Sequence, residues 1–556
     1  MTRNPILRDV VALAALVLIG VGIPLVLVVK AQGVGLPHND DWVYMLGATN
    51  LYRSGAISMP GHSAAAVGQL ILAQPLLHLA NGNPWAFTAF GLGMTALGIA
   101  ATYLLARAFL GLAGAVLVAL LVIAFPGFER QAATFMTDGP AFALEMLSLL
   151  LGVVWLRSGR WAAFAGSMVI ALIGVAIREF AVIVPGAVLG ISLVRPPTGT
   201  RRGVVVAGVL TALGIVAVLL ASRTPPPAGA SVGFKPDAAR ILWLSATLTT
   251  FAAVLLPAIL LAVGRHLRVL NPIQFVVSLA VVMIALAVAG VGPLIGNTWT
   301  ATGTLGRQVL SGIRPLVGNA IFWSMSENLA VLAAVLGLAL VLAWAYAVFG
   351  GTRTIGTLWR RGLEAAQTPT AVLALFILGY GAALAVANWR MPVFDRDLYP
   401  MVPAGAIILV RAAGPVRWLG RAQVATYAAL GWLAVSAAMM ATNSFGYDAA
   451  RWRAGEAAVA AGYAASTVDA GYEWVGFHAS PRPANAPGLP GLTGYDNALL
   501  SAMPCALVSN SALALPHYTL IHTDTAAYRE FLVIGPRERL YLYGLTDPRC
   551  PPPAGR

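Results

Sequence analysis

Residues 10–29 read VVALAALVLIGVGIPLVLVV, an unbroken run of 20 residues without a polar side chain. An α-helix needs about 20 such residues to cross the hydrocarbon core of a bilayer. Similar runs recur as far as about residue 441, and only 10% of the 556 residues are charged, against about 25% in soluble domains. The sequence therefore predicts an all-α polytopic membrane protein.

The apolar runs predict about 13 transmembrane helices. We interpret the first run as a retained helix, because no small-residue cleavage site follows it. The spans at 162–177 and 180–194 are short, and they could instead form one bent hairpin. The expected spans are 10–30, 84–106, 109–125, 139–156, 162–177, 180–194, 203–221, 241–263, 273–294, 328–349, 369–388, 398–413 and 422–441.

Basic residues between the runs predict the orientation. Short loops rich in Arg and Lys stay in the cytoplasm, and 16 of the 35 basic residues lie on one side of these spans, accompanied only by Asp9 and Glu364. We therefore expect a cytoplasmic (inner) membrane protein with a cytoplasmic N-terminus and an extracytoplasmic C-terminus. The net charge of +14 is then a topology signal, and no nucleic-acid partner is expected.

Two domains are expected. Residues 1–441 form the transmembrane module, with a long first outer loop at 31–83 that contains an interfacial helix at 64–79. Residues 442–556 regain charge and lack long apolar runs, so they predict a small extracytoplasmic α/β domain, with a helix at 448–464 and strands at 518–523, 530–535 and 539–544. Cys505 and Cys550 lie there and could pair outside the cytoplasm.

The acidic residues gather on the expected outer face, most conspicuously as Asp40-Asp41 in the stretch PHNDDWVY (residues 37–44). Two adjacent carboxylates raise one another's pKa, which favours a general base, and Trp42 and Tyr44 could stack on a sugar. The alternative is an ordinary helix N-cap or a solvated loop.

Two further motifs combine charge with helix boundaries. Asp138, in Thr-Asp-Gly-Pro at residues 137–140, is typical of an ordinary helix start. Arg178 and Glu179 interrupt an apolar stretch, and neighbours on a helix point about 100° apart. Each therefore needs another partner, in an ion-pair network or in a substrate.

The loop NWRMPVFDRDLYP (residues 388–400) is dense in polar and aromatic side chains. Arg390 and Arg396 could hold a phosphate through charge-assisted hydrogen bonds, or they could neutralise Asp395 and Asp397. His38, His62 and His78 are scattered, and the chain has no zinc-site spacing and no nucleotide-binding motif. We expect no metal and no cofactor.

Taken in order, the acidic pair, the Thr-Asp-x-Pro helix start, the Arg-Glu pair and Phe394-Asp395-Arg396-x-Leu398-x-Pro400 resemble the GT-C integral-membrane glycosyltransferases, in the branch of protein O-mannosyltransferases and aminoarabinose transferases. The resemblance implies an inverting transfer of a sugar from a polyprenyl-phosphate donor to an acceptor hydroxyl on the outer face of the membrane. The acceptor could be a glycan, a lipid or a protein.

The resemblance also implies roles for the residues quoted above. Asp41 or Asp40 would be the base, with Asp41 preferred because it directly precedes Trp42. Asp138 would be a second carboxylate, and Arg396, with Arg390 or Arg178, would bind the donor phosphate. The residues implied to contact substrate are Trp42, Tyr44, Glu179, Asp395 and Tyr399.

Two considerations limit this interpretation. The family often has Asp-Glu where this chain has Asp-Asp, which leaves open which acid acts. A transporter or flippase of a lipid-linked saccharide is the alternative function. It would require charged residues at midplane depth and repeated halves, and the chain offers mainly Arg178-Glu179.

Overall fold

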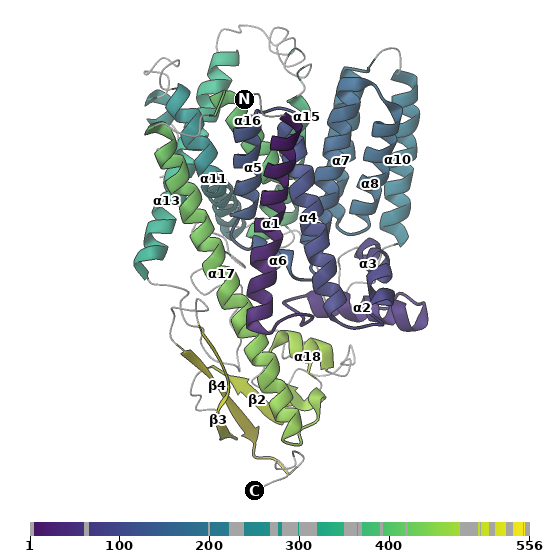
Figure 1. Cartoon of the computed structure of the whole chain (residues 1–556), viewed down its shortest axis with the longest axis vertical. Coiled ribbons are helices and arrows are strands. Elements are labelled where there is room, and N and C mark those ends of the chain that lie inside the picture. The colour runs from purple at the N-terminus through teal and green to yellow at the C-terminus, as the bar shows by residue number, and fades with distance from the viewer. Residues whose placement is uncertain are drawn as a thin grey trace.

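The computed structural model places most of the chain in one elongated molecule (Figure 1). The N-terminal end of helix α1 and the strands of the C-terminal sheet lie toward opposite ends of the long axis. The described residues are 5–59, 66–197, 201–221, 238–266, 276–280, 299, 320–349, 364, 368, 370–389, 393–416, 421–478, 499–500, 502–510, 517–529, 537–548 and 550.

Within these ranges, eight helices are long and apolar enough to cross a membrane. Other apolar helices are shorter and pack among them or at one end. The long helices are α1 (Pro5–Ala31), α4 (Trp85–Arg107), α7 (Asp138–Ser158), α10 (Arg201–Ala221), α11 (Ala238–His266), α13 (Ala320–Phe349), α15 (Ala371–Asn388) and α17 (Arg421–Ala460). The shorter ones are α3 (Val67–Leu79), α5 (Leu112–Ile123), α8 (Trp161–Val175), α9 (Ile183–Val194) and α16 (Met401–Ala413).

The predicted all-α membrane architecture with a small C-terminal sheet is confirmed, whereas the count of 13 spans is not. Four predicted spans form helices α5, α8, α9 and α16, of 12 to 15 residues. Such a helix rises only about 20 Å, less than a bilayer core. Their apolar character reflects burial inside the protein as well, as in α5, where eight of 12 residues are buried. The expected span 273–294 lies outside the described residues except at 276–280.

One end of the bundle, which we call the tail end, faces the C-terminal sheet. Helices α2 (Asp41–Ser54) and α3 lie near this end, to one side of the sheet (Figure 1). The expected interfacial helix at 64–79 is α3. The short helix α6 (Phe128–Ala132) and the single turns η1 (Glu179–Val182) and η2 (Asp395–Leu398) complete the elements that carry the candidate site.

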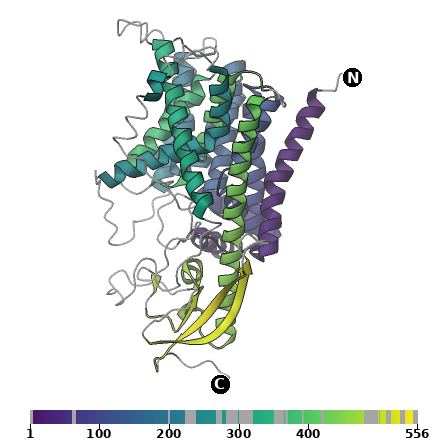
Figure 2. The ribbon, with the colours of Figure 1, turned by 90° about the vertical axis from the view of Figure 1, so that its left-hand side faces the viewer.

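Helix α17 runs without interruption from the bundle into the tail. It has 40 residues, and at 1.5 Å per residue it extends for about 60 Å. The expected span at 422–441 and the expected tail helix at 448–464 are therefore parts of one helix, and the expected domain boundary at 441 falls inside it. Figure 2 shows this helix descending alongside the strands.

The tail contains a four-stranded sheet in the order β1-β2-β4-β3, formed by β1 (Val468–Asp469), β2 (Ala506–Ser509), β3 (Tyr518–Arg529) and β4 (Arg537–Leu545). Strands β1 and β2 are parallel, and the other pairs are antiparallel. Two expected strands, 518–523 and 539–544, are confirmed as parts of β3 and β4. The third, 530–535, lies outside the described residues.

The sheet packs on the second half of α17 and is joined to it by small elements. The turn η3 (Ala465–Thr467) follows α17, and α18 (Tyr472–His478) follows β1. Ala450 and Ala454 of α17 share a buried cluster with Leu540 and Leu542 of β4. Cys505 and Cys550 form a disulfide at the edge of this cluster.

Candidate functional site

The site is organised around residues 37–41, which connect α1 to α2 at the tail end. Asn39 has a left-handed backbone, with φ of 56°, which turns the chain sharply before Asp40 and Asp41. Asn is among the few residues that tolerate this conformation. The turn leads directly into the first residue of α2, Asp41.

Asp40 lies on the accessible side of this turn. Its Oδ1 accepts a hydrogen bond of 2.8 Å from the Tyr472 hydroxyl of α18, and its Oδ2 accepts one of 3.2 Å from the Asn39 side chain. Oδ2 also lies 3.7 Å from Nη2 of Arg396. The side chain keeps 20% of its surface exposed, so Asp40 combines access with a facing guanidinium.

Asp41 points the other way and is completely buried. Its Oδ2 accepts a 2.9 Å hydrogen bond from the Phe135 amide. Burial raises the pKa of this carboxyl to about 7, although His38, the Phe135 amide and Arg130 favour its ionised form. The pKa suits a base near neutrality, but the carboxyl has no exposed surface.

Arg178 bridges two carboxylates from different elements. Its Nη1 lies 2.5 Å from Oδ1 of Asp138, at the start of α7, and its Nη2 is hydrogen-bonded to Asp397 of η2. Burial lowers the pKa of Arg178, but these two carboxylates more than offset it, so the pKa is raised. Arg178 therefore lies in an ion-pair network, one of the two interpretations that its sequence context left open.

Arg396 has fewer close carboxylate partners than Arg178. The ion pair described for it is the 3.7 Å contact with Asp40, and its Nε has no hydrogen-bond acceptor within the described ranges. It lies over the Phe394 ring at 5.4 Å. Burial lowers the pKa of Arg396, and Asp138, Asp40 and Asp397 raise it more. This arginine remains charged while retaining donors for an anion.

The two other acids of this loop support its backbone. Asp395 is fully buried, and its carboxylate accepts the amides of Trp299 at 2.5 Å and of Arg396 at 2.8 Å. Asp397 accepts the Phe394 amide at 2.9 Å in addition to Arg178. Asp395, expected to contact substrate, thus fixes the turn that carries Arg396.

The expected sugar-stacking residues of α2 are packed inside the protein. Trp42 and Tyr44 each expose 4% of their surface. The Trp42 ring meets the Tyr472 ring edge-on at 5.9 Å. Its other neighbour is Gly476, where any Cβ would approach the indole to 2.3 Å, so α18 is pressed against Trp42. Trp42 therefore joins α2 to helix α18 of the tail.

The remaining predicted residues pack elsewhere in the bundle, are exposed, or lie outside the described residues. Tyr399 packs among Phe142 at 4.1 Å and Phe125 at 5.2 Å, inside the bundle. Glu179 is exposed and begins the turn η1. Arg390 lies outside the described residues.

Sequence reasoning missed several polar contacts that join this site from distant parts of the chain. Tyr472 and Glu473 contact the 37–41 segment from more than 430 positions away, and Asp448 contacts His38. An apolar helix that suddenly gains Asp, Arg and Trp, as α17 does after residue 447, was the available signal. Among the described residues, no group of three His, Cys, Asp or Glu side chains could hold a metal ion.

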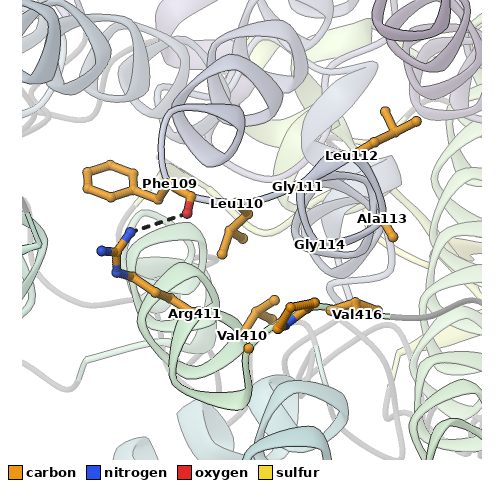
Figure 3. Close-up of a pocket in the computed structure, with 11 residues that line it drawn as sticks. Phe109, Leu110, Gly111, Leu112, Ala113, Gly114, Val410, Arg411 and Val416 are labelled. Carbon is orange, nitrogen blue, oxygen red and sulfur yellow. Dashed lines mark hydrogen bonds between the residues drawn. The ribbon is translucent and has the colours of Figure 1, made fainter. Parts of the chain in front are cut away.

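Two cavities lie elsewhere. Figure 3 shows one of about 380 Å³ between the α4–α5 turn and the end of α16, bordered by Gly111, Val410 and Arg411. It lies at the end of the bundle away from the sheet. Another, of about 260 Å³, is almost entirely apolar and lies among α11, α13 and α16, with Leu248 and Phe251 in its wall.

Comparison with known proteins gave matches among solved structures only. No family model and no curated protein sequence matches the chain. The structure of ArnT from Cupriavidus metallidurans bound to undecaprenyl phosphate matches with a TM-score of 0.42 and 13% identity, over 80% of this chain and 79% of that one. An archaeal oligosaccharyltransferase, AglB from Archaeoglobus fulgidus, in complex with an inhibitory peptide and a dolichol phosphate, matches with a TM-score of 0.39 and 15% identity.

The second match covers 80% of this chain but 58% of the oligosaccharyltransferase chain, so the chain spans little more than half of that protein. Both proteins belong to the GT-C superfamily, which the sequence motifs also resemble.

Proposed function

We propose that this protein is an inverting glycosyltransferase that moves a sugar from a polyprenyl-phosphate donor to an acceptor hydroxyl. The reaction takes place at the tail end of the bundle, which we place on the outer face of the cytoplasmic membrane. The Cys505–Cys550 disulfide supports this orientation, because disulfides persist in oxidising compartments. Residues 1–441 supply the membrane module and residues 442–556 the outer domain.

One observation carries the proposal: a partly exposed carboxylate, Asp40, lies 3.7 Å from Arg396, whose Nε has no hydrogen-bond acceptor among the described residues. A sugar phosphate needs a cation for its leaving group, and the attacking hydroxyl needs a base. The two groups are adjacent here at the edge of an apolar bundle, where a lipid-linked donor would present its phosphate.

The proposed reaction needs no group beyond these and the two substrates. Asp40 removes the proton from the acceptor hydroxyl, and the hydroxyl oxygen attacks the anomeric carbon on the face opposite the phosphate. The bond between that carbon and the phosphate oxygen breaks with its electron pair on oxygen. Arg396 neutralises the resulting charge, and polyprenyl phosphate leaves.

The structure favours Asp40 over Asp41 as the base in this scheme. Asp41 has the more suitable pKa, but its carboxyl is fully enclosed and accepts the Phe135 amide. A base must come within hydrogen-bond reach of the proton it removes. We assign Asp41 to holding the start of α2 against the loop before α7, and Arg178 to bridging Asp138 and Asp397 rather than to holding phosphate.

The experiment supplies purified protein in lipid nanodiscs with labelled polyprenyl-phosphate mannose or arabinose and a membrane extract as acceptor. We expect transfer by the wild type and a loss of about 10²–10⁴-fold in Asp40→Asn, the usual contribution of a positioned base. Arg396→Gln should weaken donor use as well. Arg53→Gln, an exposed arginine of α2, is the matched control and should retain full transfer.

Full transfer by Asp40→Asn would overturn the assignment of the base. Wild-type protein that moves the intact labelled lipid between leaflets, with no sugar transferred, would replace the proposal with the flippase alternative.

A further inference from the structure

The loop that carries Asp40 is held on its inner side by a buried hydrogen bond to α17. Nδ1 of His38 lies 2.7 Å from Oδ2 of Asp448, and the two side chains expose 1% and 3% of their surfaces. The residues are 410 positions apart in the chain. This contact joins the segment before α2 to the second half of the continuous helix α17.

The chemistry of the pair fixes the orientation of the imidazole. A carboxylate only accepts hydrogen bonds, so Nδ1 of His38 carries the hydrogen and donates it to Asp448. The ring also meets Phe445 of α17 edge-on at 5.2 Å. Arg130 of α6 approaches the same Asp448 oxygen at 3.8 Å. The ring is thus held by one hydrogen bond and by packing against one helix.

The next residues are held by other elements in turn. The Asn39 amide donates to Oε1 of Glu473 at 2.9 Å, and Asp40 is held by Tyr472. Because His38 precedes Asp40 by only two residues across a left-handed turn, a displacement of the imidazole is transmitted to the Asp40 carboxylate.

Stability alone does not account for this pair. A buried polar pair is often no better for stability than apolar side chains of similar volume, whereas it does define one arrangement of its partners. The arrangement defined here is the position of residues 37–41 relative to α17. Arg396, which faces Asp40, comes from η2 on another part of the bundle.

We propose that His38 and Asp448 are positioning residues that hold the Asp40 carboxylate in line with Arg396. The inference rests on the proposed function, since it assigns a consequence to the place of the base. Neither residue touches the substrates, and their effect passes through the backbone of residues 38–40.

The first test separates kcat from KM for sugar transfer. His38→Ala should lower kcat by about 100-fold, the usual effect of a small misplacement of a reacting group, with little change in KM for the donor. His38→Asn should restore most of kcat, because its amide N–H can donate to Asp448 in place of Nδ1. Asp9→Asn, which weakens a partly exposed pair with Arg107 at the other end of the bundle, should leave kcat unchanged.

The second test measures amide hydrogen exchange and needs no transfer activity. The amides of residues 39–44 should exchange faster in His38→Ala and at the wild-type rate in His38→Asn. If the alanine variant does not fold, His38→Phe/Asp448→Asn, which removes the unpaired buried carboxylate, should fold and show the same faster exchange.

Unchanged exchange in both disruptive variants, or a wild-type kcat in His38→Ala, would overturn the inference. Faster exchange in a protein whose wild type transfers no sugar would reject the proposed function while leaving the mechanical role of the pair intact.

Discussion

Arginines occupy both ends of the helix bundle, but their surroundings differ. At the end away from the sheet, Arg107 pairs with Asp9 at 2.8 Å, with about a third of each side chain exposed. Arg411 donates to the Phe109 carbonyl beside the cavity of Figure 3. At the tail end, Arg178 and Arg396 are largely enclosed among carboxylates.

The comparison separates two uses of the same residue type. Partly exposed arginines in short loops act as a topology signal and need little from their neighbours. An enclosed guanidinium must be compensated, since an unpaired buried charge is costly. The tail-end network therefore makes each of its members depend on the others, and substitutions should have larger effects there.

Removal of the central arginine of that network should have the largest effect on stability. We expect Arg178→Gln to lower the free energy of unfolding by about 3–5 kcal/mol, because Asp138 and Asp397 lose their shared cation while enclosed. Thermal unfolding of the purified protein measures the loss, with Arg53→Gln as the exposed control. A change no larger than that of the control would show that the two ends do not differ.

The burial of Asp41 at the tail end should make the stability of the fold depend on pH. Its pKa is raised from 3.8 to about 7, so the folded state holds this proton more tightly than the unfolded state. The stability that the bound proton contributes is therefore lost as the pH rises from about 4 to about 7. Above about pH 7, the stability no longer changes through this carboxyl. At about 1.4 kcal/mol per pKa unit, the loss is at most on the order of 4 kcal/mol.

Asp41→Asn should abolish this part of the pH dependence, since the amide oxygen can still accept the Phe135 amide. The measurement compares melting temperatures of variant and wild type between pH 4 and pH 8. The variant should gain stability relative to the wild type as pH rises. Parallel curves would show that Asp41 is not enclosed as described.

The smallest effect is expected at the other end of the bundle. Asp9→Asn removes the charge from a partly exposed pair, and such pairs contribute about 0.2–1 kcal/mol. Its effect should shrink further in high salt, because exposed charges are screened. A loss as large as that of Arg178→Gln would contradict the distinction between the two ends.

The membrane part of the fold was largely predictable from the sequence, because hydropathy reports directly on the solvent of each segment. The length of the helices was less predictable. A run such as 109–125 is equally apolar whether it faces lipid or, like most of α5, the inside of the protein. Strands β1 and β2 were missed because they have only two and four residues.

The candidate site was predictable in its composition but not in its pairing. The motifs identified Asp40, Asp138, Arg178 and Arg396, which the structure brings together. The sequence could not show that Arg178 bridges two carboxylates, or that Arg396 Nε lacks an acceptor in the part of the chain that the structure describes. Nor could it show that Asp40 is the more exposed member of its pair. Those distinctions depend on contacts with η2 and α18, far along the chain.

The continuity of α17 has a mechanical consequence. A helix without a break transmits rotation about its axis as well as translation along it. The orientation of the tail about this axis is therefore fixed relative to the bundle. One residue inserted between Phe445 and the bundle would turn everything beyond it by about 100° and advance it by about 1.5 Å. Asp448 would then face away from the imidazole it holds. The number of residues in α17, and not only their identity, therefore determines whether Asp448 can reach His38.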